Sequence, residues 1–459
     1  MRMNGHYDAI IIGAGQAGPS LAGRLTGAGM TVAVVERHLF GGTCINTGCT
    51  PTKSLVASAR VAYQARRASE YGLRIDGSIS IDLRAVKSRK DGIVTGAREG
   101  VERWLRRMER CRVIKGHARF ESPHEMRIGD ELISAERIFL NVGGRALVPG
   151  MPGIDNVPYL TNTSILELDA LPRHLVIVGG SYVGLEFAQM YRRFGSQVTV
   201  VEKSPRLLSR EDEEISSAIG SILEREGISL RTKAECIRLM RRGEDIVVGV
   251  DCEVGDRQVA GSHVLLAVGR RPNTDDLLLE KAGIAVDERG YIVVDDQLRT
   301  NVPGIWALGD CNGRGAFTHT AYNDFEIVAG NLLEGGNRRV SDRVSCYALF
   351  IDPPLGRAGM TESEARSAGR KIRVGKRPMT RVSRAVEKGE TNGLMKILVD
   401  AESEEILGAA ILGVGGDEAV HGILDVMSAK KPYTTLRDTM HIHPTVSELI
   451  PTILGELTP

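Results

Sequence analysis

The sequence contains the same unit twice, and this repeat constrains the fold more than any other feature. In the first copy, an apolar run at residues 9–12 leads into the glycine-rich segment 13–18, and a second apolar run ends at Glu36. In the second copy, the same pattern starts at Leu175 and ends at Glu202. The first glycine and the final glutamate are 23 positions apart in both copies. The pattern predicts two strand–glycine turn–helix–strand units.

Each copy has the features of a dinucleotide site. Glycines allow the backbone to approach a pyrophosphate, the helix N-terminus favours negative charge, and the closing glutamate can accept hydrogen bonds from a ribose. Ser181 replaces the middle glycine of the second copy, which predicts weaker or shifted pyrophosphate binding there. The alternative is that two glycine turns belong to unrelated α/β units, which leaves their shared register unexplained. The expected contacts are Gly13, Gly15, Gly18 and Glu36 in the first copy and Gly179 and Glu202 in the second.

Length and charge exclude several classes of protein. A chain of 459 residues is expected to form two to four domains. The formal net charge of +1 provides no general attraction for nucleic acid or an anionic membrane. We see no targeting signal and no apolar run of the about 20 residues that a membrane span needs, so a cytoplasmic location is expected. Seven cysteines are too few for a secreted disulfide scaffold.

A closely spaced cysteine pair stands out in residues 41–53. Cys44 and Cys49 are five positions apart, which on a regular helix corresponds to about 8 Å. A disulfide needs Cα atoms within about 7 Å, so the helix must be interrupted if the two bond. Pro51 predicts the first helical position and Thr50 the N-cap, which places Cys49 just before a helix N-terminus that stabilises a thiolate.

Other interpretations of the cysteines stay open at this point. The pair could be a structural disulfide or two buried thiols, and zinc would need a second Cys or His pair at suitable spacing. The remaining cysteines are scattered and are expected to be ordinary core residues: Cys111, Cys236, Cys252, Cys311 and Cys346.

Residues 41–53 strongly resemble the active-site signature of the FAD-dependent pyridine nucleotide-disulfide oxidoreductases. This family includes dihydrolipoamide dehydrogenase, glutathione reductase and mercuric reductase. The resemblance covers the whole chain in order. Residues 267–273 resemble the segment that closes the nicotinamide domain, residues 300–310 the second FAD motif, and residues 441–448 the C-terminal signature with an acid–base histidine.

The resemblance implies a redox-active disulfide between Cys44 and Cys49. Cys49 would be the charge-transfer thiolate beside the flavin, and Cys44 the interchange thiol that meets the substrate. His443 would carry the proton, oriented by Glu448, and both would reach the active site of the other subunit of a homodimer. A metal pair formed by His441 and His443 is the alternative, although no third ligand is evident.

The resemblance also implies the cofactor contacts. Lys53 would lie near the flavin and pair with Glu186, and Tyr182 would cover the nicotinamide pocket, although a surface ion pair and simple packing are alternatives. Further FAD contacts are expected from Arg37, Gly42, Thr43, Ala118, Gly143, Asp310 and Ala321. Further nicotinamide contacts are expected from Val183 and Gly269. No resident metal is expected.

The implied fold class is α/β, with two Rossmann-like dinucleotide-binding domains and a C-terminal α+β dimerisation domain. The FAD domain is expected over residues 1–148 and 272–338, the NAD(P) domain over 149–271, and the dimerisation domain over 339–459. Within the last domain, an alternating strand at residues 393–400 and a helix near residues 417–429 are expected.

The implied reaction passes hydride from NAD(P)H through FAD to the disulfide, and then to a small disulfide, an oxidant or a metal ion. Glu202 favours NADH, while Lys203 and Arg206 could instead reach the phosphate of NADPH. The local sequence is mercuric reductase-like. Efficient mercury reduction is nevertheless not expected, because no cysteine follows Cys346 and the chain begins directly at the flavin fold. Dihydrolipoamide dehydrogenase is one alternative, and a redox-sensing flavoprotein without its own substrate turnover is another.

Overall fold

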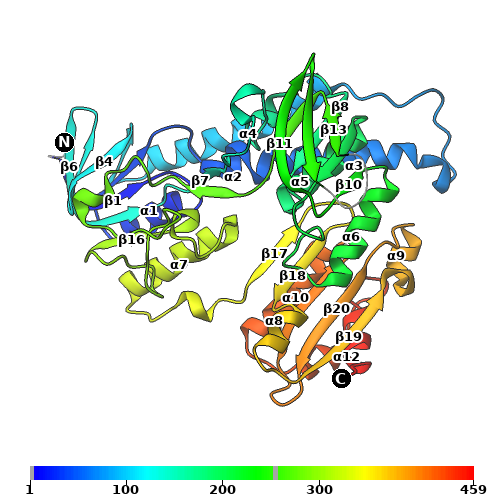
Figure 1. Cartoon of the computed structure of the whole chain (residues 1–459). Helices are drawn as coiled ribbons and strands as arrows, with labels where there is room; N and C mark the ends of the chain where they lie inside the picture. Colours follow the sequence, from blue (N-terminus) through cyan, green and yellow to red (C-terminus); the bar gives the residue numbers. More distant parts are fainter. Residues whose placement is uncertain (1–4, 252–256) are drawn as a thin grey trace. The chain divides into compact units, whose positions relative to one another are not determined.

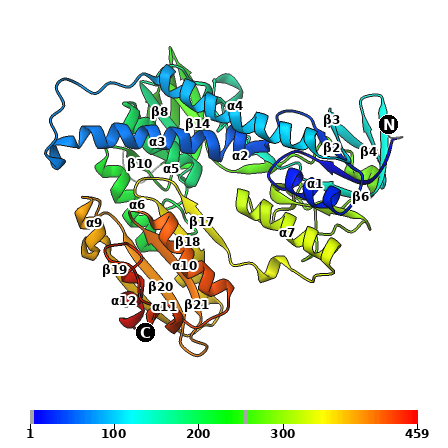
Figure 2. The ribbon, with the colours of Figure 1, turned by 180° about the vertical axis from the view of Figure 1, so that it is seen from behind.

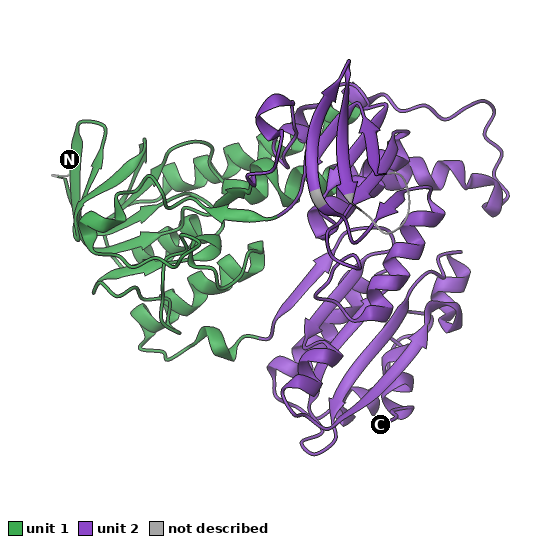
Figure 3. Ribbon diagram, viewed as in Figure 1, with its two compact units in different colours: residues 1–54, 85–147, 269–343 green, residues 55–84, 148–268, 344–459 purple. Residues whose placement is uncertain are grey.

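The computed structural model describes residues 5–251 and 257–459, which form two compact units (Figures 1 and 3). Unit 1 contains residues up to 54, 85–147 and 269–343, and unit 2 contains residues 55–84, 148–268 and 344–459. The predicted division into three domains, with boundaries near residues 148, 271 and 338, stays a prediction.

Unit 1 is built on a mixed sheet in the order β3-β2-β1-β6-β5-β4, with β16 also paired to β6. The strands β1, β2, β3, β6 and β16 pair in parallel, whereas β4 and β5 form an antiparallel extension. The bounds are β1 His6–Ile12, β2 Val32–Glu36, β3 Cys111–Lys115, β4 Ala118–Ser122, β5 Glu125–Ile128, β6 Glu131–Leu140 and β16 Ile305–Ala307.

Helices cover the faces of this sheet because β1 and β2 are apolar along nearly their whole length and must be buried on both sides. Helix α1 packs on β1 and β2 and lies beside α7 (Figure 1). The helices of unit 1 are α1 Ala17–Gly27, α2 Gly42–Thr47, most of α4 Leu83–Arg107, and α7 Thr318–Glu334. A short antiparallel pair joins β7 Gly144–Ala146 and β15 Arg270–Pro272.

Unit 2 contains the second copy of the repeat. A parallel sheet runs in the order β10-β9-β8-β14, and an antiparallel sheet β11-β12-β13 accompanies it. Helix α5 connects β8 to β9, as α1 connects β1 to β2 in unit 1. The bounds are β8 His174–Val178, α5 Tyr182–Phe194, β9 Gln197–Val201, α6 Glu213–Arg225, β10 Ser229–Arg231, β11 Glu235–Arg242, β12 Asp245–Asp251, β13 Gln258–Gly261 and β14 His263–Leu266.

The C-terminal part of unit 2 is an antiparallel sheet in the order β17-β18-β21-β20-β19, with α10 packed on β18 and β21 (Figure 2). The strands are β17 Cys346–Leu349, β18 Leu355–Gly359, β19 Ile372–Pro378, β20 Leu394–Asp400 and β21 Ile406–Leu412. The helices are α8 Glu362–Ser367, α9 Ser383–Glu387, α10 Gly416–Ser428, α11 Thr434–Arg437 and α12 Leu449–Gly455. The predicted α/β class, with two Rossmann-like units and a C-terminal α+β part, is confirmed.

One expectation about this sheet is wrong. Strand β20 does not alternate between buried and exposed residues, because every residue from Met395 to Asp400 is buried. Helix α12 packs against β20 and β19, so the face that was expected to meet solvent is covered.

Lys396 is a buried charge inside β20. Its side chain is 3% exposed, and its Nζ lies 2.7 Å from Glu362 Oε2 and 2.6 Å from Glu214 Oε1. The hydrogen bond from Lys396 lowers the pKa of Glu362 to about 2. The lysine therefore holds carboxylates of α6 and α8 against the C-terminal sheet.

We expect Lys396→Met to lower the free energy of unfolding by about 3 kcal/mol at pH 7, because it leaves the buried Asp212 and the half-buried Glu214 and Glu362 without their cation. The contribution of Glu362 is fully present above its unfolded pKa of 4.5 and is lost as the pH falls toward its folded pKa of about 2. The difference from wild type should therefore shrink in urea titrations between pH 5 and pH 3. Lys376→Met is the matched control, because Lys376 pairs with Glu214 while 46% exposed and should contribute less than about 1 kcal/mol. An equal loss from both variants at every pH would contradict this account.

Candidate active site

The first glycine loop is packed backbone against backbone. Gly13 has φ +100°, and a Cβ atom there would lie 2.2 Å from the carbonyl oxygen of Asn141. A Cβ at Gly18 would lie 2.3 Å from the carbonyl oxygen of Gly13, and one at Gly42 would lie 2.7 Å from the Cα of Gly15. Side chains are therefore excluded at these three glycines, where the backbone packs closely, as the turn that binds a dinucleotide requires.

The glutamate that closes each repeat is fixed in the same way. Glu36 accepts hydrogen bonds from the backbone N–H of Ala14 and of His38, both at 2.8 Å. Glu202 accepts them from Gly180 at 2.6 Å and from Ser204 at 2.7 Å. Each carboxylate is thus held beside its glycine loop at the end of the second strand, where a ribose of a dinucleotide binds.

The start of α5 and the second glycine loop together form the second expected dinucleotide site. Gly179 has φ +116°, and a Cβ at Gly184 would lie 2.1 Å from the Gly179 carbonyl oxygen, so the loop is as tight as the first. Ser181 is the N-cap in extended conformation and its side chain makes no capping hydrogen bond. The first amides of α5 therefore point toward the loop with the partial positive charge that a phosphate prefers. Tyr182 and Val183 are the first two residues of α5.

The cysteine segment is interrupted as expected, but at a different residue. Helix α2 ends at Thr47 and helix α3, Cys49–Arg66, begins at Cys49 rather than at Pro51. The backbone N–H of Thr52 donates to the carbonyl of Gly48 at 3.1 Å, so Gly48 rather than Thr50 occupies the N-cap position. Glycine suits this break because a Cβ there would lie 2.9 Å from the carbonyl oxygen of Thr43.

The two cysteines have different surroundings. Cys49 is exposed and its Sγ lies 3.1 Å from Oγ1 of Thr318, the first residue of α7. Cys44 is half-buried in α2. The hydrogen bond with Cys49, burial and the charge of Cys49 raise the pKa of Cys44 above its ordinary value, and a hydrogen bond with Thr318 opposes part of this rise. The raised pKa of Cys44 and the beginning of two helices at Cys49 both favour negative charge on Cys49 over Cys44.

Sequence reasoning missed Thr318. The available signal was a hydroxyl residue at the start of the helix that follows the second FAD motif. A hydroxyl at that position can donate a hydrogen bond to a thiolate, whereas the predictions considered only the cysteines and the histidine.

The second FAD motif is supported by a buried carboxylate that was also missed. Asp324, 2% exposed, accepts hydrogen bonds from the N–H of Gly309 at 2.8 Å and from Asn312 Nδ2 at 2.9 Å, and it pairs with Arg343. Together these bonds fix the turn that presents Asp310, whose carboxylate lies 3.2 Å from Arg270 Nε.

The other expected FAD contacts lie in unit 1, where Arg37 forms an ion pair with Asp276 at 2.6 Å. Gly42 and Thr43 open α2, Ala118 opens β4, Gly143 follows β6, and Ala321 lies in α7. Gly269 also belongs to unit 1, whereas the other expected nicotinamide contacts belong to unit 2. Lys53 lies in α3 within unit 1 and Glu186 in α5 within unit 2, so their pairing stays a prediction.

The predicted histidine and carboxylate are brought together. His443 Nδ1 lies 2.8 Å from Glu448 Oε2, and the histidine side chain is 74% exposed while the glutamate is 15% exposed. A carboxylate on Nδ1 fixes the ring and leaves Nε2 as the nitrogen that can exchange a proton. His441 Nδ1 lies 2.9 Å from the carbonyl oxygen of Thr439, so its ring has a different partner.

The cysteines outside the pair have varied surroundings. Burial raises the pKa of Cys111 to about 11 and that of Cys311 to about 12, and Cys346 is half-buried. Cys252 lies outside the described residues, as does the side chain of Cys236.

Two further properties concern the described residues. Among residues 5–251 and 257–459, no helix combines the length and the apolar character needed to cross a membrane. In the same ranges, no three histidine, cysteine or acidic side chains are grouped so that they could hold a metal ion.

Comparison with known proteins identifies the family. The family model described as pyridine nucleotide-disulphide oxidoreductase matches residues 7–324, and the model of the dimerisation domain of the same family matches residues 345–453.

Curated relatives cover nearly the whole chain. The chain is 39% identical to a probable pyridine nucleotide-disulfide oxidoreductase, RclA of Escherichia coli, over 96% of its own length and 97% of the relative. It is 34% identical to a mercuric reductase of Streptomyces lividans, covering 97% and 94%, and 33% identical to a dihydrolipoyl dehydrogenase of Thermus scotoductus, covering 96% and 95%.

Solved structures agree with the curated relatives. The HOCl-induced flavoprotein disulfide reductase RclA of Escherichia coli superposes with a TM-score of 0.89 at 38% identity, covering 98% of this chain and 99% of that one. Its Cu(II) complex superposes with the same score over 99% of this chain and 100% of that one. The chain therefore belongs to the pyridine nucleotide-disulfide oxidoreductases, a family of FAD-containing enzymes that use NAD(P)H.

Proposed function

We propose that this enzyme uses NADH to reduce a small oxidant, metal ion or low-molecular-weight disulfide through a redox-active Cys44–Cys49 disulfide. The observation that carries the proposal is the contrast between the two sulfurs: Cys49 is exposed at the start of α3, whereas Cys44 is half-buried and its pKa is raised. The first glycine loop and Glu36 would hold FAD, which when bound would supply the two-electron chemistry between the nicotinamide and the disulfide.

Different residues of the chain would then carry out different steps of the thiol chemistry. The start of α3 and the hydroxyl of Thr318 hold negative charge on Cys49. Cys44 is the thiol that reacts with a disulfide substrate: His443 removes its proton, the Cys44 sulfur attacks one substrate sulfur, and the other leaves and takes the proton from His443. Cys49 then attacks Cys44 in the mixed disulfide, which releases the second thiolate and re-forms the Cys44–Cys49 bond.

A homodimer is part of the proposal. The match to the dimerisation domain supports it. Next to His443, the apolar side chains of Met440 and Ile442 are 96% and 80% exposed, as expected of a segment that a second subunit covers. His443 and Glu448 would then complete the active site of the partner. The cytoplasmic location also stays a prediction.

The choice of acceptor rests on the similarity to RclA. That relative is described as HOCl-induced, and its structure is known with Cu(II). We therefore place a small oxidant or metal ion ahead of lipoamide, although the 33% identity to a dihydrolipoyl dehydrogenase keeps lipoamide as the second candidate. A sensor without turnover fits less well, because it would not need the proton-transferring pair of His443 and Glu448.

Side-by-side turnover assays with NADH test this ranking. Hypothiocyanite, Cu(II), Hg(II), oxidised lipoamide and glutathione disulfide would be compared at equal concentration. We expect an oxidant or Cu(II) to give the highest kcat/KM, and faster turnover of lipoamide would contradict the ranking.

The variant His443→Gln tests the role of the histidine in the same assays. It should lower the turnover of disulfide acceptors about 100-fold, because the proton of Cys44 loses its acceptor. Reduction of the enzyme by NADH should remain unchanged.

The geometry also supports NADH over NADPH. Glu202 is fixed by two backbone amides, and its charge would repel a 2′-phosphate. Arg206, one of the residues that could favour NADPH, donates to the carbonyls of Ser209 and Glu211 at 3.3 and 3.2 Å.

We expect Glu202→Gln to raise the ratio of kcat/KM for NADPH to that for NADH about tenfold, which corresponds to about 1.4 kcal/mol. Glu36→Gln, the equivalent change in the first repeat, should weaken FAD retention without altering that ratio. A wild-type enzyme that is tenfold more efficient with NADPH would contradict the preference.

A further inference from the structure

One face of helix α5 carries four polar residues at helical spacing. Tyr182 and Glu186 occupy its first two turns, and Gln189 and Arg193 continue the same face toward its C-terminal end. Gln189 is 3% exposed and Arg193 is 4% exposed. The first pair is expected at the nicotinamide, whereas the proposed reaction gives the second pair no role.

This face of α5 binds the backbone of a loop that precedes β18. The N–H of Phe350 donates to Glu186 Oε1 at 3.0 Å. The N–H of Asp352 donates to Gln189 Oε1 at 2.7 Å, and Gln189 Nε2 donates to the carbonyl of Asp352 at 2.9 Å. Glu186 is therefore oriented by a loop whose own position depends on Gln189.

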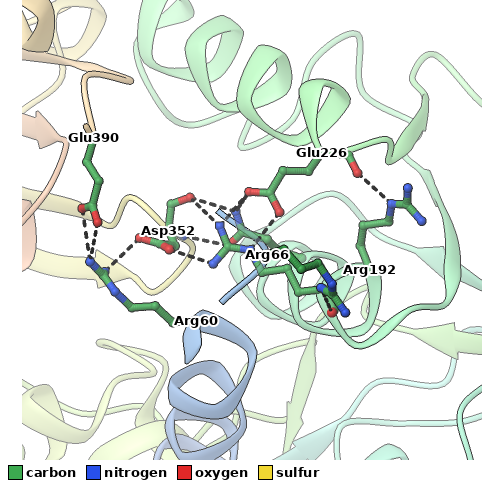
Figure 4. Close-up of polar contacts among 8 residues, drawn as sticks. Arg60, Arg66, Arg192, Glu226, Asp352 and Glu390 are labelled. Atoms are coloured by element: carbon green, nitrogen blue, oxygen red, sulfur yellow. Dashed lines mark hydrogen bonds and ion pairs between the residues drawn. The ribbon is translucent and has the colours of Figure 1, made fainter. Parts of the chain in front are cut away.

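The carboxylate of Asp352 joins two helices. Its Oδ2 lies 2.7 Å from Arg193 Nη1. Its Oδ1 lies 2.9 Å from Arg60 Nη1 on α3, a contact that Figure 4 shows. Arg193 also binds Glu226 at 2.7 Å, and its guanidinium lies 3.8 Å from the centroid of the Tyr63 ring. The same loop is thus held to α5 and to α3.

The arrangement fixes the part of α3 that belongs to unit 2 to α5. Tyr63 and Arg60 lie in the C-terminal half of α3, which is one continuous helix from Cys49 to Arg66. A buried charge network of this kind is weak evidence for added stability, because apolar residues of the same volume often serve as well. Its directional bonds do specify one geometry, and a displacement of about 1 Å can lower a reaction rate about 100-fold.

We propose that Gln189, Arg193 and Asp352, which we call the α5 clamp, are positioning residues for hydride transfer from the nicotinamide. They act through Glu186, whose carboxylate is held by the same loop, and they touch neither cofactor in this scheme. The inference rests on the proposed placement of Tyr182 and Glu186 at the nicotinamide.

Two variants test the clamp. Asp352→Asn removes the charge that joins Arg193 and Arg60. Gln189→Leu removes the hydrogen bonds to the Asp352 backbone and to the Glu226 carboxylate while keeping a side chain of similar size. In anaerobic stopped-flow experiments on the holoenzyme, we expect the limiting rate of flavin reduction at saturating NADH to fall about tenfold. The affinity for NAD⁺, measured by calorimetry, should change less than about threefold, because the glycine loop and Glu202 are intact.

Hydrogen exchange of the oxidised holoenzyme gives a second readout that does not depend on reduction of the flavin. In Gln189→Leu, the amides of both Phe350 and Asp352 should exchange about tenfold faster, because a shifted loop loses Glu186 as well as Gln189. Faster exchange at Asp352 alone, together with an unchanged rate of flavin reduction, would overturn the proposal.

Glu390→Gln is the matched control. Glu390 joins the same network through Arg60, at 2.9 Å, whereas Gln189 and Arg193 bind Asp352 directly. It should lower the melting temperature without slowing flavin reduction, and an equal slowing in this variant would also overturn the proposal. These rates are independent of the acceptor, so an error in the proposed substrate would leave the test intact.

Discussion

The proposed chemistry depends on keeping negative charge on one sulfur and a proton on the other. The beginnings of α3 and α7 meet at Cys49, where the Thr318 hydroxyl lies 3.1 Å from the sulfur. Cys44, five residues earlier in α2, is half-buried and its pKa is raised. The break at Gly48 makes this possible, because a continuous helix would hold the sulfurs apart and give them similar surroundings.

The two copies of the repeat would provide the two dinucleotide sites that reduction of this cysteine pair needs. In each, tight backbone packing keeps side chains out of the glycine loop, and a glutamate at the end of the second strand is bound by two amides. The copies lie in different units, one with the cysteine pair and one with Tyr182 and Glu186. The buried charges of the α5 clamp would also orient the residues at the second dinucleotide site.

Several features of the fold and the site could be predicted from the sequence because they depend on residues close together in the chain. The repeat, the two glutamates and the need for a helix break follow from spacing and backbone geometry within a few tens of residues. The histidine and its carboxylate, five positions apart, were also predicted, and the structure places them 2.8 Å apart.

The parts that sequence reasoning missed depend on residues far apart in the chain. Thr318 is 269 positions from Cys49, and Asp352 is 163 positions from Gln189, so no periodicity relates them. The burial of β20 on both faces depends on α12, and the shift of the α3 start from Pro51 to Cys49 depends on the acceptor that Gly48 supplies. Such features follow from the packing of whole elements rather than from local pattern.

Anaerobic titration of the oxidised holoenzyme with NADH tests the central claim most directly. If Cys44 and Cys49 form the redox-active disulfide, the first two electrons should leave the flavin spectrum largely oxidised and produce a long-wavelength absorbance from the Cys49 thiolate beside the flavin. If the flavin instead bleaches with the first two electrons and no such band appears, the disulfide takes no part in electron transfer and the proposed mechanism is wrong.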